Sequence, residues 1–119
     1  MNINKFQKIN AKRAKIWHSD ISRPWSLLEW AGAMCGESGE AANFAKKILR
    51  IELGSINREW GVKKNNLEEL KIKLAKETAD SIIYGLLILS ELGVEASEII
   101  ADVFDNKSIE YEFSERAPR

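Results

Sequence analysis

Apolar residues separated by three and four positions recur along most of this chain, and this periodicity is typical of α-helices. The alternation of apolar and polar residues that indicates strands is absent, and only two prolines occur, Pro24 and Pro118. The chain has 119 residues, of which 45% are apolar and 30% charged, as in globular proteins. We therefore predict an all-α protein that forms one domain over residues 1–119.

Four helices are predicted, over about 3–17, 26–50, 66–92 and 94–111. Ser26 and Glu29 have the spacing of a capping box, in which each side chain binds a free backbone amide at the start of a helix. Asn66 and Glu69 repeat this pattern. Gly93 is the predicted stop of the third helix, because glycine readily adopts the conformation that ends helices. A polar stretch over 52–65 is expected to be an irregular loop.

Two pairs of acidic residues lie inside the apolar helical segments: Glu37 with Glu40, and Glu77 with Asp80. The members of each pair are three residues apart, so they share one face of a helix. The long connection allows the two helices to pack antiparallel, which would bring the four carboxylates together. Carboxylates crowded in this way repel each other unless a cation neutralises them, and carboxylate oxygens suit Mg²⁺ or Mn²⁺. A cation of this kind assists phosphoryl-group hydrolysis, in which Glu40 is our candidate for orienting the attacking water.

Composition and charge exclude several other classes of protein. Eighteen basic residues balance eighteen acidic ones and we identified no basic helix, so neither nucleic acid nor a membrane is an expected partner. Cys35 and His18 are the only residues of their types, which excludes a zinc site built from cysteine and histidine. Cys35 is expected to be a buried, inert thiol. The chain shows no signal sequence and no long apolar run, so we expect it in the cytoplasm.

The acids and their neighbours resemble the MazG-like branch of the all-α nucleoside triphosphate pyrophosphohydrolases. The first motif is Glu37-x-x-Glu40 within 36–43, preceded by Trp25, Ser26 and Trp30 and followed by Lys46 and Lys47. The second is the segment 77–84, which contains Glu77, Asp80 and Tyr84. Segments 104–107 and 113–116 are similar to the family's Phe-Asn-Lys and Ser-Glu-Arg elements. This chain differs by a longer segment over 50–66 and by an insertion over 108–112.

The resemblance implies Mg²⁺-dependent cleavage of a (deoxy)nucleoside triphosphate to the monophosphate and pyrophosphate. It also implies a four-helix-bundle-type domain that works as an oligomer. Four acids match the family's metal ligands and catalytic residues: Glu37, Glu40, Glu77 and Asp80. Asn106 and Lys107 match positions that contact the phosphates or sugar of the nucleotide. The sequence leaves the preferred base and sugar open.

Further candidates for binding the substrate are Trp25, Trp30, Lys46, Lys47 and Tyr84. The tryptophans are candidates for stacking on a base, and core packing is the alternative. Helical geometry places Lys47 on the acidic face, as it does Tyr84 one turn after Asp80, whereas the resemblance favours Lys46. Asn106 is predicted to project from the apolar face of the last helix, where its amide needs a partner.

The segment 82–89 is apolar on nearly every side, which predicts a subunit interface in a homodimer or homotetramer. The main alternative function is a non-catalytic helical protein that binds a nucleotide or a protein partner. In that case the acids would form salt bridges with neighbouring lysines: Lys46, Lys47, Lys73 and Lys76. A di-iron carboxylate bundle needs Glu-x-x-His pairs, and the sequence contains none.

Overall fold

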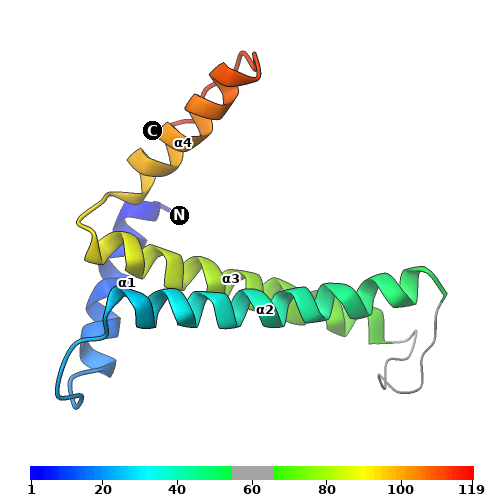
Figure 1. Cartoon of the computed structure of the whole chain (residues 1–119), viewed down its shortest axis with the longest axis horizontal. Coiled ribbons are helices and arrows are strands. Elements are labelled where there is room, and N and C mark those ends of the chain that lie inside the picture. Colours follow the sequence, from blue (N-terminus) through cyan, green and yellow to red (C-terminus); the bar gives the residue numbers. More distant parts are fainter. Residues whose placement is uncertain (55–65) are drawn as a thin grey trace. The chain divides into compact units, whose positions relative to one another are not determined.

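A computed structural model of the chain describes residues 1–54 and 66–119 (Figure 1). Within these residues it contains four α-helices and no strand, which confirms the all-α prediction. The helices are α1 (Ile3–Trp17), α2 (Leu27–Glu52), α3 (Leu67–Glu91) and α4 (Ala96–Glu110). Most of the loop predicted over 52–65 lies outside the described residues.

The chain divides into two compact units. One unit contains Met1–Leu27 and Leu86–Arg119, and the other contains Leu28–Gly85. We describe each unit by itself, and the organisation of the chain as one domain stays a prediction. None of the helices in the described ranges has both the length and the apolar character needed to cross a bilayer.

The observed helix ends follow local sequence signals. The side chain of Asn2 accepts hydrogen bonds from the amides of Asn4 and Lys5, so it caps the start of α1. Gly93 follows the end of α3 with φ of +70°, a conformation that favours glycine. The amide of Val94 donates to the carbonyl of Leu89 at 2.9 Å, which completes a Schellman-type end. The predicted stop at Gly93 is confirmed.

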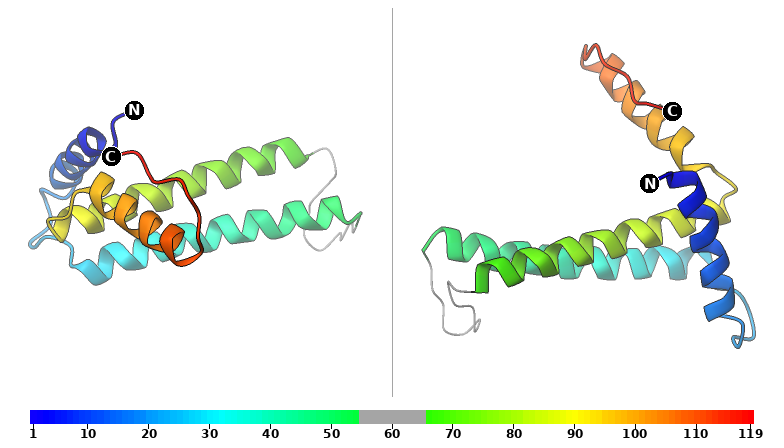
Figure 2. Two further views of the ribbon diagram at one scale, coloured as in Figure 1. Left: turned by 90° about the horizontal axis from the view of Figure 1, so that it is seen from above. Right: turned by 180° about the vertical axis from the view of Figure 1, so that it is seen from behind.

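In the unit Leu28–Gly85, α2 and α3 lie side by side and run antiparallel (Figures 1 and 2). The rings of Trp30 and Tyr84 have their centroids 6.1 Å apart. Further along α2, the Phe44 ring lies 5.9 Å from the amino group of Lys73. Trp30 of α2 thus lies beside Tyr84 of α3, and Phe44 of α2 lies near Lys73 of α3. The antiparallel pairing predicted from the long connection is therefore confirmed.

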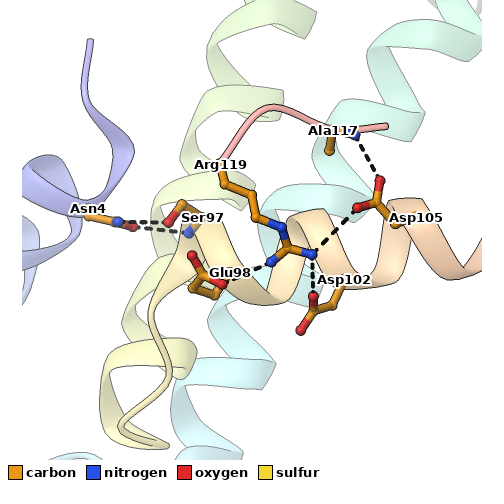
Figure 3. A network of polar contacts seen from close by, with 7 residues as sticks. All are labelled: Asn4, Ser97, Glu98, Asp102, Asp105, Ala117 and Arg119. Atoms are coloured by element: carbon orange, nitrogen blue, oxygen red, sulfur yellow. Dashed lines mark hydrogen bonds and ion pairs between the residues drawn. The ribbon is translucent and has the colours of Figure 1, made fainter. Parts of the chain in front are cut away.

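In the other unit, α1 supplies the capping groups for the start of α4. Gln7 Nε2 donates to the carbonyl of Val94 at 2.8 Å, and Gln7 Oε1 accepts from the amide of Ala96 at 2.9 Å. Asn4 Oδ1 accepts from the amide of Ser97 at 3.0 Å, and Asn4 Nδ2 donates to the Ser97 hydroxyl at 2.7 Å (Figure 3). The predicted start at residue 94 is wrong by two residues, because these capping groups are distant in sequence.

The last residues of the chain are tied to α4 by a network of ion pairs (Figure 3). The guanidinium of Arg119 donates to the carboxylates of Glu98 at 2.9 Å, Asp102 at 2.7 Å and Asp105 at 3.4 Å. The amide of Ala117 also donates to Asp105, at 2.8 Å. Arg119 thus offsets part of the repulsion among three acids that lie along one face of α4.

Few large side chains are deeply buried in the described part of the chain. The buried hydrophobic residues there are Trp30, Ile51, Leu70, Leu86, Leu87, Ala96 and Ala101. Within the segment 82–89, Leu86 and Leu87 are covered by the chain itself, whereas Ile82 stays 56% exposed. Cys35 is exposed, so the expectation of a buried thiol is wrong. Each described helix leaves large apolar side chains exposed, among them Ile9 on α1, Leu49 on α2, Ile72 on α3 and Val103 on α4.

Replacing Gln7 tests whether its capping of α4 stabilises the fold. We expect Gln7→Met to lower the free energy of unfolding by about 1–3 kcal/mol, because it leaves polar backbone groups of Val94 and Ala96 without partners. Urea unfolding followed by circular dichroism measures this loss. Lys5→Gln is the control, since Lys5 is exposed on the same helix. Equal stability of the two variants would contradict the capping role.

Candidate metal centre

Three acidic side chains from two helices meet in the unit Leu28–Gly85. Glu37 and Glu40 of α2 and Glu77 of α3 each place a carboxylate oxygen within 4.8 Å of the other two. Helical spacing puts Glu37 and Glu40 on one face, and the antiparallel packing of α3 brings Glu77 to it. Glu37 and Glu77 are half-buried and Glu40 is exposed, so solvent reaches the acidic cluster from the side of Glu40.

Asp80, the fourth predicted ligand, is outside this group of three. It is exposed, although its charge is close enough to raise the pKa of Glu77. Three residues of an α-helix rotate a side chain about 60° away from its starting direction. Glu37 and Glu40 have the same spacing and both belong to the group, so the spacing alone does not explain the position of Asp80, and its role as a ligand stays a prediction.

The cluster has a strong effect on the ionisation of Glu77. A hydrogen bond with Glu37, burial, and repulsion from the charges of Glu37, Glu40 and Asp80 raise the pKa of Glu77 from 4.5 to about 7. The Oε2 atom of Glu77 is buried and has no hydrogen-bond partner among the described residues. A buried carboxylate oxygen without a partner costs free energy. A bound cation or a proton at this oxygen would lower that cost.

No lysine or arginine in residues 1–54 and 66–119 forms an ion pair with the three glutamates. Lys73, one of the lysines proposed to neutralise them, pairs instead with Glu69 at 3.1 Å. Lys47 and Lys76 likewise form no salt bridge with the three glutamates, and the non-catalytic alternative stays open. A proton shared between Glu37 and Glu77 is the compensation that the raised pKa of Glu77 indicates.

Two serines link the helices beside the acidic cluster, and the sequence analysis missed both. The Ser38 hydroxyl donates to the Ser81 hydroxyl at 3.1 Å, and Ser81 donates to the carbonyl of Glu77 at 3.1 Å. Ser38 follows Glu37 directly, and Ser81 lies four residues after Glu77, one turn along the same face. This spacing is the signal that identifies them. Their hydrogen bonds fix the relative positions of α2 and α3 next to the carboxylates.

The residues present fit a hard divalent cation. The donor atoms are carboxylate oxygens, which Mg²⁺ and Mn²⁺ prefer, and they come from two helices that other contacts hold together. The unpartnered Oε2 of Glu77 is a free acceptor within this set. No nitrogen or sulfur donor belongs to the cluster, so a softer metal such as zinc is not favoured.

The aromatic and basic candidates near the cluster have different environments. Trp30 is only 6% exposed and packs beside Tyr84, which supports the core-packing alternative. Lys47 places its amino group 5.6 Å from the centre of the Phe44 ring, so it lies on the face of α2 that packs toward α3. Lys46 is exposed. Lys47 is therefore the better positioned of the two lysines with respect to that face.

The remaining candidates belong to the unit that contains α1 and α4. Trp25 forms an edge-to-face contact with His18, with ring centroids 4.7 Å apart. Lys107 pairs with Glu110 at 3.3 Å. Asn106 is exposed on α4, so solvent can satisfy its amide, and its predicted contact with a ligand stays a prediction. The structure gives these three residues no shared site.

Comparisons with protein-family models, with curated proteins and with solved structures find no match for this chain. The resemblance to the MazG-like enzymes is thus carried by the sequence motifs alone and stays a hypothesis.

The pKa of Glu77 predicts how stability depends on pH without metal. A carboxyl group with a raised pKa binds more protons in the folded state, so its contribution is complete below pH 4.5 and is lost as the pH rises to about 7. We expect the thermal midpoint in chelator to fall over this range, and Glu77→Gln to remove much of the fall. Glu68→Gln, an exposed site on α3, is the control. An unchanged pH profile in Glu77→Gln would contradict the prediction.

Proposed function

We propose that this protein is a Mg²⁺-dependent nucleoside triphosphate pyrophosphohydrolase. The observation that carries the proposal is the meeting of Glu37, Glu40 and Glu77 within 4.8 Å on two antiparallel helices, without a compensating basic side chain in the described residues. The resemblance of the surrounding motifs to the MazG-like enzymes supports the choice of substrate. The reaction hydrolyses the bond between the α and β phosphates and yields the monophosphate and pyrophosphate.

The proposed cation ligands are Glu37, Glu40 and Glu77, with Asp80 beside them. When bound there, Mg²⁺ would neutralise phosphate charge and lower the pKa of a water molecule. Glu40 is the exposed member of the cluster, so its carboxylate is the one we assign to accept the proton of the attacking water. Glu37 and Glu77 are half-buried, which suits them to hold their positions during the reaction.

Other residues are assigned to binding the substrate. We assign Lys47 to a phosphate oxygen, because it lies on the face of α2 next to α3. Contact of Tyr84 with the nucleotide is proposed from its place one turn after Asp80, whereas Trp30 is buried beside it and is assigned to packing. Contacts of Trp25, Lys46, Asn106 and Lys107 with the nucleotide are proposed from the resemblance.

The test is pyrophosphate release from a panel of ribo- and deoxynucleoside triphosphates, with Mg²⁺ and with chelator. We expect release that needs Mg²⁺ and that falls about a hundredfold or more in Glu37→Gln, Glu40→Gln and Glu77→Gln. Glu68→Gln should keep full activity, because Glu68 is exposed on the same helix as Glu77 and outside the cluster.

Two results would contradict the enzyme. Release that survives chelation or the loss of all three glutamates would place the chemistry elsewhere. Nucleotide binding without any release, in a preparation that binds Mg²⁺, would favour the non-catalytic helical protein. Full activity of Glu40→Gln with normal Mg²⁺ affinity would overturn the assignment of Glu40 alone.

We also propose that the protein forms a homodimer or homotetramer. Support comes from exposed apolar side chains on α4, where Ile100 is 50%, Val103 58% and Phe104 46% exposed. Their spacing places all three on one face of the helix, and an apolar face of this kind is expected to be covered by another subunit. The segment 82–89 contributes less than predicted, because the chain itself covers Leu86 and Leu87.

Sedimentation at micromolar concentration tests the oligomer. We expect a dimer or tetramer for the unmodified protein and a shift toward monomer in Val103→Asp, since a charge is costly inside an apolar interface. Leu53→Asp is the control, because Leu53 is exposed just after the end of α2. A monomer for the unmodified protein would contradict the proposal.

A further inference from the structure

A basic groove lies in the unit that contains α1 and α4, on residues that the proposed reaction does not use. It is an open groove of about 530 Å³ between α1 and the turn that joins α3 to α4. Lys8, Lys12 and Lys15 of α1 line one side of it. The opposite side is formed by Ser90 and by the turn residues Gly93 and Val94. Figure 2 shows α1 passing this turn.

The three lysines form a row of like charges on one helix face. Their spacing of four and three residues makes them neighbours along about 10 Å of α1. No carboxylate in the described part of the chain forms an ion pair with any of them. The helix as a whole carries five basic residues and no acidic one, so the premise that the chain lacks a basic helix is wrong.

The acidic row on α4 provides an internal comparison. Glu98, Asp102 and Asp105 have the same spacing of four and three residues, and the single guanidinium of Arg119 pairs with all three (Figure 3). The chain thus supplies a counter-charge to the acidic row and none, in its described residues, to the lysine row. The lysine row also borders a groove, whereas most basic side chains on a helix point into open solvent.

The walls of the groove are suited to hold a small ligand in one position. Gln7 forms two hydrogen bonds across its base, to the carbonyl of Val94 and from the amide of Ala96, which fix α1 against the turn. Gly93 has no side chain, so a ligand can approach the backbone there. The hydroxyl of Ser90 adds a neutral donor. Glu95 is the one acidic residue in the lining, and its charge opposes an anion.

We propose that this groove binds the phosphate groups of a small anionic ligand. Three lysines that leave the helix over about 10 Å of its length can each extend an ammonium group to a diphosphate or to two neighbouring phosphates. Each ammonium forms charge-assisted hydrogen bonds to phosphate oxygens. The phosphate source is either a free phosphorylated molecule or the headgroup of an anionic lipid, and these two are separated by experiment.

The probe for a free ligand is inorganic pyrophosphate, in the presence of chelator so that the acidic cluster of Glu37, Glu40 and Glu77 repels it. Binding is followed by titration calorimetry and by the NMR shifts of the Gly93 and Val94 amides. We expect Lys8→Gln, Lys12→Gln and Lys15→Gln each to weaken binding by about threefold to tenfold. Glu95→Gln should tighten it by about twofold to fivefold, because it removes the opposing charge.

Lys5→Gln is the matched control. Lys5 is an exposed lysine of the same helix and does not line the groove, so its loss changes the net charge equally and should leave binding within twofold. The second arm measures sedimentation with vesicles of phosphatidylcholine and phosphatidylglycerol in equal parts. Loss of vesicle binding in the groove variants, with Lys5→Gln unaffected, would support the groove and identify lipid phosphate as the source.

Two outcomes would overturn the proposal. One is no binding of either probe at millimolar phosphate. The other is an equal loss of binding in Lys5→Gln and in the groove variants, since the whole basic face of α1 would then attract polyanions and the groove would have no special role. The proposed hydrolysis needs Mg²⁺, so a binding measurement in chelator is independent of it, and pyrophosphate binding at the groove can fail while the enzyme activity holds.

Discussion

Repulsion between like charges on neighbouring helical positions is the constraint that connects the main features of this protein. It acts on three clusters: Glu37, Glu40 and Glu77, then the acidic row on α4, and the lysine row on α1. Each crowded cluster costs free energy unless something of opposite charge is added. On α4 the chain itself reduces this cost with the positive charge of Arg119. The other two clusters have no such partner in the described residues, and both of our ligand proposals arise from this difference.

Local sequence signals predicted most of the secondary structure because the interactions that create it are local. The end of α3 depends on Gly93 and on hydrogen bonds within five residues, and the start of α2 follows Ser26 directly. The start of α4 was misplaced because its capping groups come from Gln7 and Asn4, which are 89 and 93 positions away in the sequence. Glu95 occupies the N-cap position of α4, but its side chain makes no capping hydrogen bond. Propensity rules do not contain such long-range hydrogen bonds.

The candidate site was predicted to the extent that helical geometry determines it. Rotation of about 100° per residue placed Glu37 and Glu40 on one face, and the antiparallel arrangement brought Glu77 to them. Helical geometry alone does not decide whether Asp80 joins the cluster, since that depends on which face of α3 packs against α2. The exposure of the apolar face of α4, from which Asn106 was predicted to project, was missed for a related reason. An apolar pattern identifies a face of a helix, but it does not say whether the same chain covers that face.

Net charge gave a misleading impression of the surface. The eighteen basic and eighteen acidic residues cancel in sum, yet α1 has five basic residues and no acidic one, and the acids concentrate elsewhere. Electrostatic attraction acts over about 8–10 Å at physiological salt, a distance shorter than the 22 Å or so of a 15-residue helix. A ligand near α1 therefore experiences the charge of that helix and its neighbours rather than the sum over the chain. For the same reason one small protein can attract a divalent cation at one site and a phosphate at another.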